Sequence, residues 1–213
     1  MAAGSRDAQG VATSDLDRQI LAILEEGDSA RAATVALRAL GPEVFGFLCG
    51  VVGAQDAEEV FSSFSMRLWR SLATFEGRCS VRTWSYVLAR HEIGRHRRGG
   101  RRHEVGRLPI SELEDVLAAA RTSTQSALGS EKARSLAKLR EDLSVEDRTL
   151  LVLRIDRKLA WEDIALAFAE SPETFGEADR KRESARLRKR FQLVKEKLVV
   201  RARALQGGKG EKQ

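Results

Sequence analysis

A run of aromatic rings and arginines marks one part of the chain as a candidate nucleic-acid surface. It reads FEGRCSVRTWSYVLARHEIGRHRRGGRR and covers residues 75–102. Rings stack on unpaired bases and guanidinium groups bind phosphates, so the combination suits single-stranded nucleic acid better than a closed duplex. A spacing of four puts Arg82, Tyr86 and Arg90 on one helix face, with the ring between two cations. The plain alternative is a set of core rings beside a solvated basic helix, and for Trp84 we favour the core.

A second basic concentration lies near the end of the chain. Eleven Lys and Arg residues fall within residues 180–203, where the acidic residues are Glu183 and Glu196. A shorter apolar segment, residues 161–169, precedes it across a turn-rich gap at 172–176. Two helices joined by a turn, the second long and basic, are typical of a helix-turn-helix, whose second helix lies in the major groove. A solvated face on a bundle helix has the same spacing, so both interpretations stay open.

Composition favours a mostly helical protein. The chain has 213 residues, 37 Lys and Arg against 31 Asp and Glu, a net charge of +6, and three prolines. This length is enough for one large domain or two small ones. The positive excess is modest, so its distribution along the chain matters more than its sum.

The sequence also predicts a cytoplasmic protein. Cys49 and Cys79 are too few for a disulfide framework in a chain of this length, which fits a reducing compartment. The first ten residues lack the apolar core of a signal peptide. We expect no membrane span, because no segment is interpreted as reaching about 20 apolar residues.

Periodicity and turn residues predict an all-α fold of two small helical domains. Gly27 and the pair Gly41-Pro42 are expected to interrupt helices, and Asp56, Ser80 and Ser144 are expected to cap them. We predict a disordered tail at 1–14, a first domain at 15–103, a flexible linker at 104–130, a second domain containing the helix-turn-helix at 131–206, and a tail at 207–213.

Residues 56–98, DAEEVFSSFSMRLWRSLATFEGRCSVRTWSYVLARHEIGRHRR, resemble the promoter-melting domain of bacterial RNA polymerase sigma factors of the extracytoplasmic-function (ECF) group. The matching motifs lie at 56–59, 64–69 and 75–90. The second half, LRIDRKLAWEDIALAF followed by SARLRKRFQLVKEKL, is similar to the family's second domain, which reads the −35 element with a helix-turn-helix. The resemblance covers about residues 15–203.

The resemblance implies a sigma factor that binds core RNA polymerase, recognises the −35 and −10 elements and promotes DNA melting. Its implied partners are the β′ clamp helices and β flap of the polymerase, promoter DNA, and an anti-sigma factor of the kind that commonly masks this group. It implies no enzyme activity, no catalytic residue, no metal and no cofactor.

Three sets of binding residues follow from the resemblance. Those expected to contact core polymerase are Asp56, Glu58, Glu59, Ser62, Ser63, Arg67 and Trp69. Those expected to contact the −10 DNA are Phe75, Arg78, Ser80, Arg82, Thr83, Trp84, Tyr86, Arg90, His91, Arg95, Arg97 and Arg98. Those expected to contact the −35 DNA are Arg180, Lys181, Arg182, Ser184, Arg186, Lys189 and Arg190.

The chain departs from the family pattern at three places. Ser62-Ser63 stand where the polymerase-facing helix usually has glutamine and an acid. Ala160 replaces a hydroxyl cap, and the turn before the last helix is longer than usual, which leaves the start of the recognition helix open.

Other function classes find less support in the residues. The sequence contains no nucleophile–base set or phosphate loop that would indicate an enzyme. Cys79, His91, His96 and His103 lack the spacing of a metal site. The main alternative is a free-standing helix-turn-helix regulator that binds duplex DNA without polymerase. A third interpretation is that the protein is an adaptor whose basic helices bind an acidic protein.

Overall fold

The computed structural model describes residues 14–99, 118, 122, 139–140 and 142–207, and over these ranges it contains helices but no strand. The α-helices of this part of the chain are α1 (Asp15–Glu25), α2 (Ser29–Val52), α3 (Ala54–Leu72), α4 (Val81–Arg97), α7 (Val145–Leu151), α8 (Trp161–Phe168) and α9 (Glu177–Gly207). A π-helical turn, Val152–Asp156, follows α7, and a 3-10 turn, Pro172–Thr174, precedes α9. The prediction of an all-α fold is confirmed for these residues.

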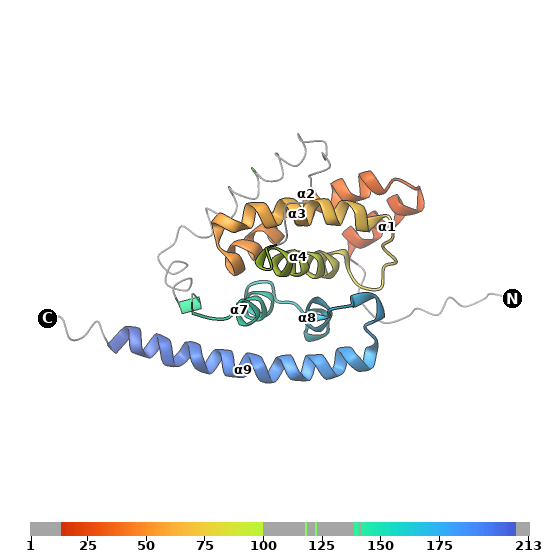
Figure 1. Cartoon of the computed structure of the whole chain (residues 1–213). Coiled ribbons are helices and arrows are strands. Elements are labelled where there is room, and N and C mark those ends of the chain that lie inside the picture. Colours follow the sequence, from red (N-terminus) through yellow and green to blue (C-terminus); the bar gives the residue numbers. More distant parts are fainter. Residues whose placement is uncertain (1–13, 100–117, 119–121, 123–138, 141, 208–213) are drawn as a thin grey trace.

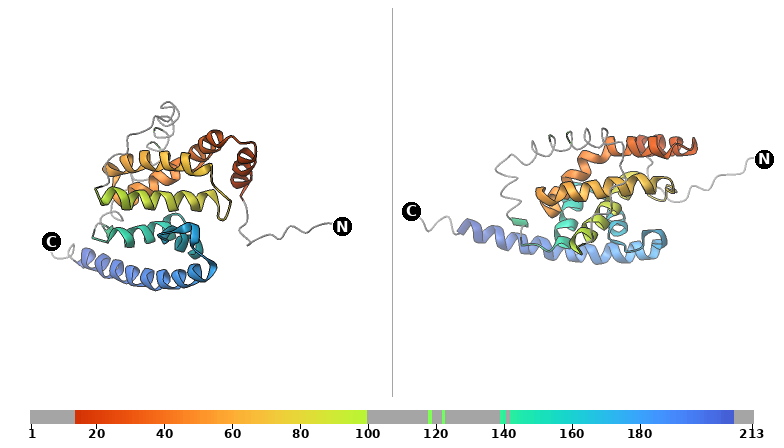
Figure 2. Two further views of the ribbon diagram at one scale, coloured as in Figure 1. Left: turned by 45° about the vertical axis from the view of Figure 1, so that its right-hand side comes forward. Right: turned by 45° about the horizontal axis from the view of Figure 1, so that its top comes forward.

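The helices stack in layers that place α4 in the middle (Figure 1). Helices α2 and α3 pack together on one side of α4, and α7 and α8 lie on its other side, with α9 beyond them. The left-hand view of Figure 2 shows the same order. Buried side chains from both groups belong to one continuous hydrophobic cluster. The division into two domains remains a prediction, and most of the expected linker lies outside the described residues.

Local capping explains where α1 and α4 begin. The Ser14 side chain accepts a hydrogen bond from the Asp17 backbone N–H, and Asp17 reaches back to Ser14 in a capping box. The other Asp17 carboxylate oxygen accepts a 2.7 Å hydrogen bond from the backbone N–H of Val81, which ties α1 to the start of α4. Ser80 accepts from the Thr83 N–H at 3.0 Å, so the predicted cap at Ser80 is confirmed.

Two predicted helix boundaries in the first half are wrong. Helix α2 runs through Pro42 without a break, since Leu40, Val44 and Phe45 on either side of it are all buried. Burial of that apolar run offsets the one backbone hydrogen bond that a proline removes. Helix α3 begins at Ala54, so Asp56 lies in its first turn and interacts with the helix dipole without capping the end.

The second group of helices follows the predicted breaks more closely. Ser144 accepts from the Asp147 N–H and caps α7. Lys158, with a φ of 56°, stands at the break predicted before α8. Ala160 precedes α8 and supplies no side-chain cap, as its lack of a hydroxyl predicts. The inner face of α9 is held by Leu187, by Val194 and by the ring of Phe191, whose centroid lies 5.5 Å from that of Trp161.

Among the described residues, α2 passes the test of length and apolar composition for a membrane span. The expectation that no segment reaches this length is therefore wrong. Half of its most apolar window is buried inside the fold, and a core helix passes the same test. This helix is weak support for a membrane location.

Candidate nucleic-acid interface

Two aromatic side chains form a partly open platform where α3 turns into α4. Phe75 and Trp84 are half-buried, with ring centroids 6.3 Å apart and planes tilted by 42°. The Trp84 indole N–H donates a 3.3 Å hydrogen bond to the Ser71 hydroxyl, which fixes the ring. Gly77, with a φ of 70°, lets the chain turn beneath them. These rings retain accessible surface on which a base could stack.

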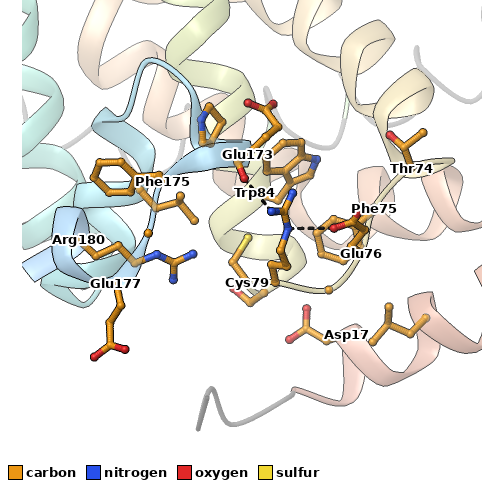
Figure 3. A pocket seen from close by; sticks show the side chains of 17 residues that line it. Asp17, Thr74, Phe75, Glu76, Cys79, Trp84, Glu173, Phe175, Glu177 and Arg180 are labelled. Carbon is orange, nitrogen blue, oxygen red and sulfur yellow. Dashed lines mark hydrogen bonds and ion pairs between the residues drawn. The ribbon is translucent and has the colours of Figure 1, made fainter. Parts of the chain in front are cut away.

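A cavity of about 540 Å³ opens beside this platform (Figure 3). The segment at 74–80 lines one side, and the other side is lined by Phe175 of the turn between α8 and α9 and by Arg180 of α9. Arg78 bridges the two sides, since it pairs with Glu76 at 3.0 Å and donates to the backbone oxygen of Glu173 at 2.7 Å. The volume lies in the range of small-ligand sites.

Tyr86 does not occupy the exposed position expected of it. Its ring is 0 % exposed, packs edge-on against Phe47 at 5.2 Å, and donates its hydroxyl to the Glu43 carboxylate at 2.7 Å. Arg82 also donates to Glu43, from Nε at 2.9 Å. The spacing of four indicates that Arg82 and Tyr86 share a face of α4. It does not indicate that other helices cover both sides of α4. Tyr86 is a core residue here, and its expected role as a stacking surface does not fit this arrangement.

Glu43 was missed by sequence reasoning, although it is the one acidic residue in the apolar run ALGPEVFGFL. Burial raises the pKa of Glu43, but hydrogen bonds from Arg82 and Tyr86 outweigh burial and hold that pKa below its usual 4.5. Its carboxylate therefore fixes the direction of Arg82 and closes the core around Tyr86.

The middle of α4 is covered by the end of α8. The guanidinium carbon of Arg90 lies 4.5 Å from the centre of the Phe168 ring, a cation–π contact, and burial lowers the pKa of Arg90. His91 donates from Nε2 to the backbone oxygen of Ala169 at 3.1 Å. Burial also holds the pKa of His91 below its usual 6.5, so the ring is neutral at pH 7.

A strongly basic pocket of about 470 Å³ lies between α4 and α7. Arg67 pairs with the buried Glu92 at 3.0 Å, and Arg97 lies 3.6 Å from Glu146 of α7. This excess of guanidinium groups over carboxylates makes the pocket suitable for phosphate. The arginines that line it are Arg67, Arg90, Arg95, Arg97 and Arg98.

The residues expected to contact core polymerase lie mainly on the outer face of α3. Arg67 turns toward Glu92, and Trp69 packs partly on the core. The Asp56 carboxylate lies 3.7 Å from His96 of α4. This leaves an exposed strip formed by Asp56, Glu58, Glu59 and Ser63, with Ser62 half-buried at its side.

The residues expected to read −35 DNA divide into two groups on α9. Lys181, Arg182, Arg186 and Lys189 are exposed on its outer side. Ser184 is 2 % exposed and donates to the backbone oxygen of Trp161 at 3.1 Å, so it holds α9 to α8 and is not placed to touch DNA. The remaining two, Arg180 and Arg190, are half-buried, and Arg190 donates to Asp147 of α7 at 2.6 Å.

Within the described part of the chain, no cluster of three or more metal-ligating side chains occurs. His103 lies outside the described residues. Burial raises the pKa of Cys49 to about 11 and that of Cys79 to about 12, so neither thiol forms a reactive thiolate near neutral pH.

A comparison with protein families matches residues 36–103 to Sigma-70 region 2. The matched residues run from α2 through α4 and contain the ring-and-arginine segment. Comparisons with curated proteins and with solved structures gave no match. The family match, which covers less than half of the chain, supports a sigma-70 factor. Such factors bind RNA polymerase and recognise the −10 element, and they are not an enzyme family.

The Glu43→Gln substitution tests the carboxylate beneath Arg82. Because the folded-state pKa is lowered, the ionised carboxylate stabilises the fold above its unfolded-state pKa, and this contribution is lost as pH falls through the folded-state value. We expect Glu43→Gln to lower the free energy of unfolding near neutral pH by about 1–3 kcal/mol. The difference from the unsubstituted chain should shrink as the pH falls through the lowered pKa of Glu43.

Urea unfolding followed by circular dichroism at several pH values measures this difference. Glu26→Gln is the matched control, because Glu26 is an exposed residue paired with Arg31. Its effect should stay below about 0.5 kcal/mol throughout. Equal effects of the two substitutions would contradict the assigned role of Glu43.

Proposed function

We propose that this chain is a sigma factor of the extracytoplasmic-function group, which directs core RNA polymerase to promoters and helps to melt them. The observation that carries the proposal is the overlap of two independent features. The Sigma-70 region 2 match falls on α2 to α4. The half-exposed ring platform and the basic pocket lie on the same helices.

In this proposal the platform receives an unpaired base of the −10 non-template strand. Phe75 and Trp84 supply the stacking surface, and Arg78, Arg95, Arg97 and Arg98 bind the phosphates that flank it. Flipping a base out of the duplex costs a few kcal/mol, which stacking and phosphate contacts must offset. Ser80 and Thr83 shape the turn that presents these rings, and Arg82 is oriented by Glu43.

The outer face of α3 is the surface proposed for the β′ clamp helices of core polymerase. Its side chains are accessible along the helix, whereas Phe61, Phe64 and Leu68 on the inner face are buried. Serines at 62 and 63 make this surface more neutral than the usual glutamine and acid. The electrostatic attraction between this surface and the polymerase is therefore expected to be weaker.

The second half is proposed as the −35 reader and as the part that meets the β flap. Helix α8, the turn at 169–176 and α9 follow one another along the chain, an order that supports the proposed helix-turn-helix. The exposed Lys181, Arg182, Arg186 and Lys189 are the candidates for DNA contact on α9. We retain a cytoplasmic location and an anti-sigma partner as parts of the same proposal.

Binding to purified bacterial core RNA polymerase is the first test of this function. We expect a one-to-one complex in a pull-down at moderate salt, where loose electrostatic contacts are screened. Glu58→Lys together with Ser62→Lys, one turn apart on α3, should weaken it about tenfold or more. Glu25→Lys with Glu26→Lys, at the C-terminal end of α1, is the control and should leave binding unchanged. No complex, with tight sequence-specific binding to duplex DNA alone, would favour the free-standing regulator.

Phe75→Ala tests the platform in promoter opening. Base stacking on a ring is worth about 1–3 kcal/mol, so we expect about a tenfold loss of permanganate reactivity at the −10 region with core polymerase binding retained. Phe175→Ala is the matched control, since Phe175 is also half-buried and lines the same cavity from the second half. The assay uses a promoter fragment selected by the reconstituted holoenzyme. Normal reactivity in Phe75→Ala would remove the platform from the mechanism.

A further inference from the structure

We propose that the pocket between α4 and α7 is a binding site for a compact chain of linked phosphates, carried by an inorganic polyphosphate or by a nucleoside triphosphate. The pocket has a volume of about 470 Å³, within the range of small-ligand sites. This inference goes beyond the function proposed above, because the site is formed within the chain and its ligand is neither promoter DNA nor polymerase.

The packing of the helices leaves this pocket open. Helix α4 packs on α8, whereas α7 packs on α2 and α9. Helix α7 lies beside α4, and side chains from both line the pocket between them (Figure 1). A Cβ built on Gly94 of α4 would lie 3.4 Å from Nη1 of Arg98. The missing side chain therefore leaves room for Arg98 to fold back along α4 and line the pocket.

Cations outnumber carboxylates in this pocket. Five arginines line it, against the two carboxylates of Glu146 and Glu170. The buried Glu92 carboxylate holds two of these arginines in place, Arg67 at 3.0 Å and Arg95 at 3.7 Å. The cations remain in excess even when Glu92 is counted. Guanidinium groups bind phosphate through pairs of N–H donors, so this excess selects an anion of that kind.

Two polar groups of the pocket have no partner among the described residues. The Arg90 guanidinium carbon lies 4.5 Å from the centre of the Phe168 ring, but no hydrogen bond or ion pair within the described part of the chain engages its N–H groups. Thr149 is 2 % exposed and lines the pocket, and its hydroxyl forms no hydrogen bond with another described residue. A buried hydroxyl without a partner is destabilising, and an acceptor oxygen of a bound ligand would remove that cost.

The number of donors favours several linked phosphates over a single one. Each guanidinium carries five N–H donors, whereas one phosphoryl group offers three strong acceptor oxygens. Among the described residues, no Phe, Tyr or Trp lines the pocket, so a nucleobase finds no such ring to stack on. We therefore expect the site to recognise the phosphate chain itself and not the nucleoside.

Occupation of the pocket would also bear on the proposed sigma function. Arg95, Arg97 and Arg98 line the pocket and are the arginines of α4 proposed to bind phosphates of the −10 strand. A phosphate chain held by them would compete with that strand for the same donors. This consequence rests on the proposed function, whereas the binding of the ligand does not.

Glu146→Gln is the most direct test, since a misfolded chain cannot gain affinity. Glu146 lies 3.6 Å from Arg97 and would repel a phosphate chain bound beside it. We expect Glu146→Gln to bind sodium tripolyphosphate at least about threefold more tightly than the unsubstituted chain. Isothermal titration calorimetry in magnesium-free buffer at about 0.15 M ionic strength measures the affinity while screening loose contacts.

Glu162→Gln is the matched control for this gain. Glu162 is exposed to a similar degree, also lies 3.6 Å from an arginine, Arg188, and does not line the pocket. Its substitution changes the net charge by the same amount, so its affinity for tripolyphosphate should equal that of the unsubstituted chain. Equal affinities of Glu146→Gln and Glu162→Gln would overturn the inference.

Arg90→Gln tests the loss of a donor. We expect it to weaken tripolyphosphate binding at least about tenfold, because charge-assisted hydrogen bonds to the ligand are lost. Arg188→Gln is its control, since Arg188 also lies over an aromatic ring, that of Trp161, but outside the pocket. Circular dichroism establishes that both variants are folded. Equal binding by the two folded variants would contradict the assigned site.

Comparison of ligands separates the two sources of the phosphate chain. ATP and tripolyphosphate should bind the unsubstituted chain within about tenfold of each other, and AMP at least about tenfold more weakly than either. A larger preference for ATP would overturn recognition through the phosphate chain alone, and equal binding of AMP would overturn the need for linked phosphates. No binding of tripolyphosphate would overturn the site itself. All of these measurements use the free chain, so a failure to bind core polymerase would overturn the proposed function and leave them standing.

Discussion

Helix α4 is buried on two sides at once, and this constraint governs the rest of the structure. One side packs on α2 and α3, and the other packs on α8. A basic helix can be enclosed in this way only if its cations find partners. Glu43 supplies a carboxylate for Arg82, Glu92 supplies one for Arg95, and Phe168 supplies a ring for Arg90. Each of these partners fixes a side chain that the proposed function would direct at DNA.

The same constraint explains how an aromatic–arginine segment can serve two purposes. Tyr86 fills the core and holds Glu43, whereas Phe75 and Trp84 at the start of α4 keep part of their surface open. The platform is therefore carried by the first turn of α4 and the preceding loop, where a cap and a tether to α1 fix the backbone. A rigid support of this kind favours capture of a base without further ordering of the protein.

Sequence reasoning predicted the helical fold and the position of the ring-and-arginine segment well, because both depend on local patterns. Ser80 and Ser144 indicate the starts of α4 and α7, because each is an N-cap residue. The error at Pro42 has a different cause, since burial on both sides of the proline is a tertiary property. Tyr86 and Ser184 were predicted to contact DNA but are buried, for the same reason. Helical spacing shows which residues share a face but not which other elements cover that face. Glu43 could have been suspected from a lone acid in an apolar run, yet its two partners lie about 40 residues away and are not visible in the pattern.

The central claim is that this chain is a sigma factor, and the binding of its two halves to separate sites on core polymerase requires them to move apart. Spin labels at Ala39 of α2 and Gln192 of α9, both exposed, would report the distance between the halves by double electron–electron resonance. Replacing Cys49 and Cys79 with alanine keeps the labelling specific. We expect one narrow distance distribution for the free chain and a clear shift to longer distances with excess core polymerase. An unchanged distribution in a demonstrated complex with the polymerase would contradict the account.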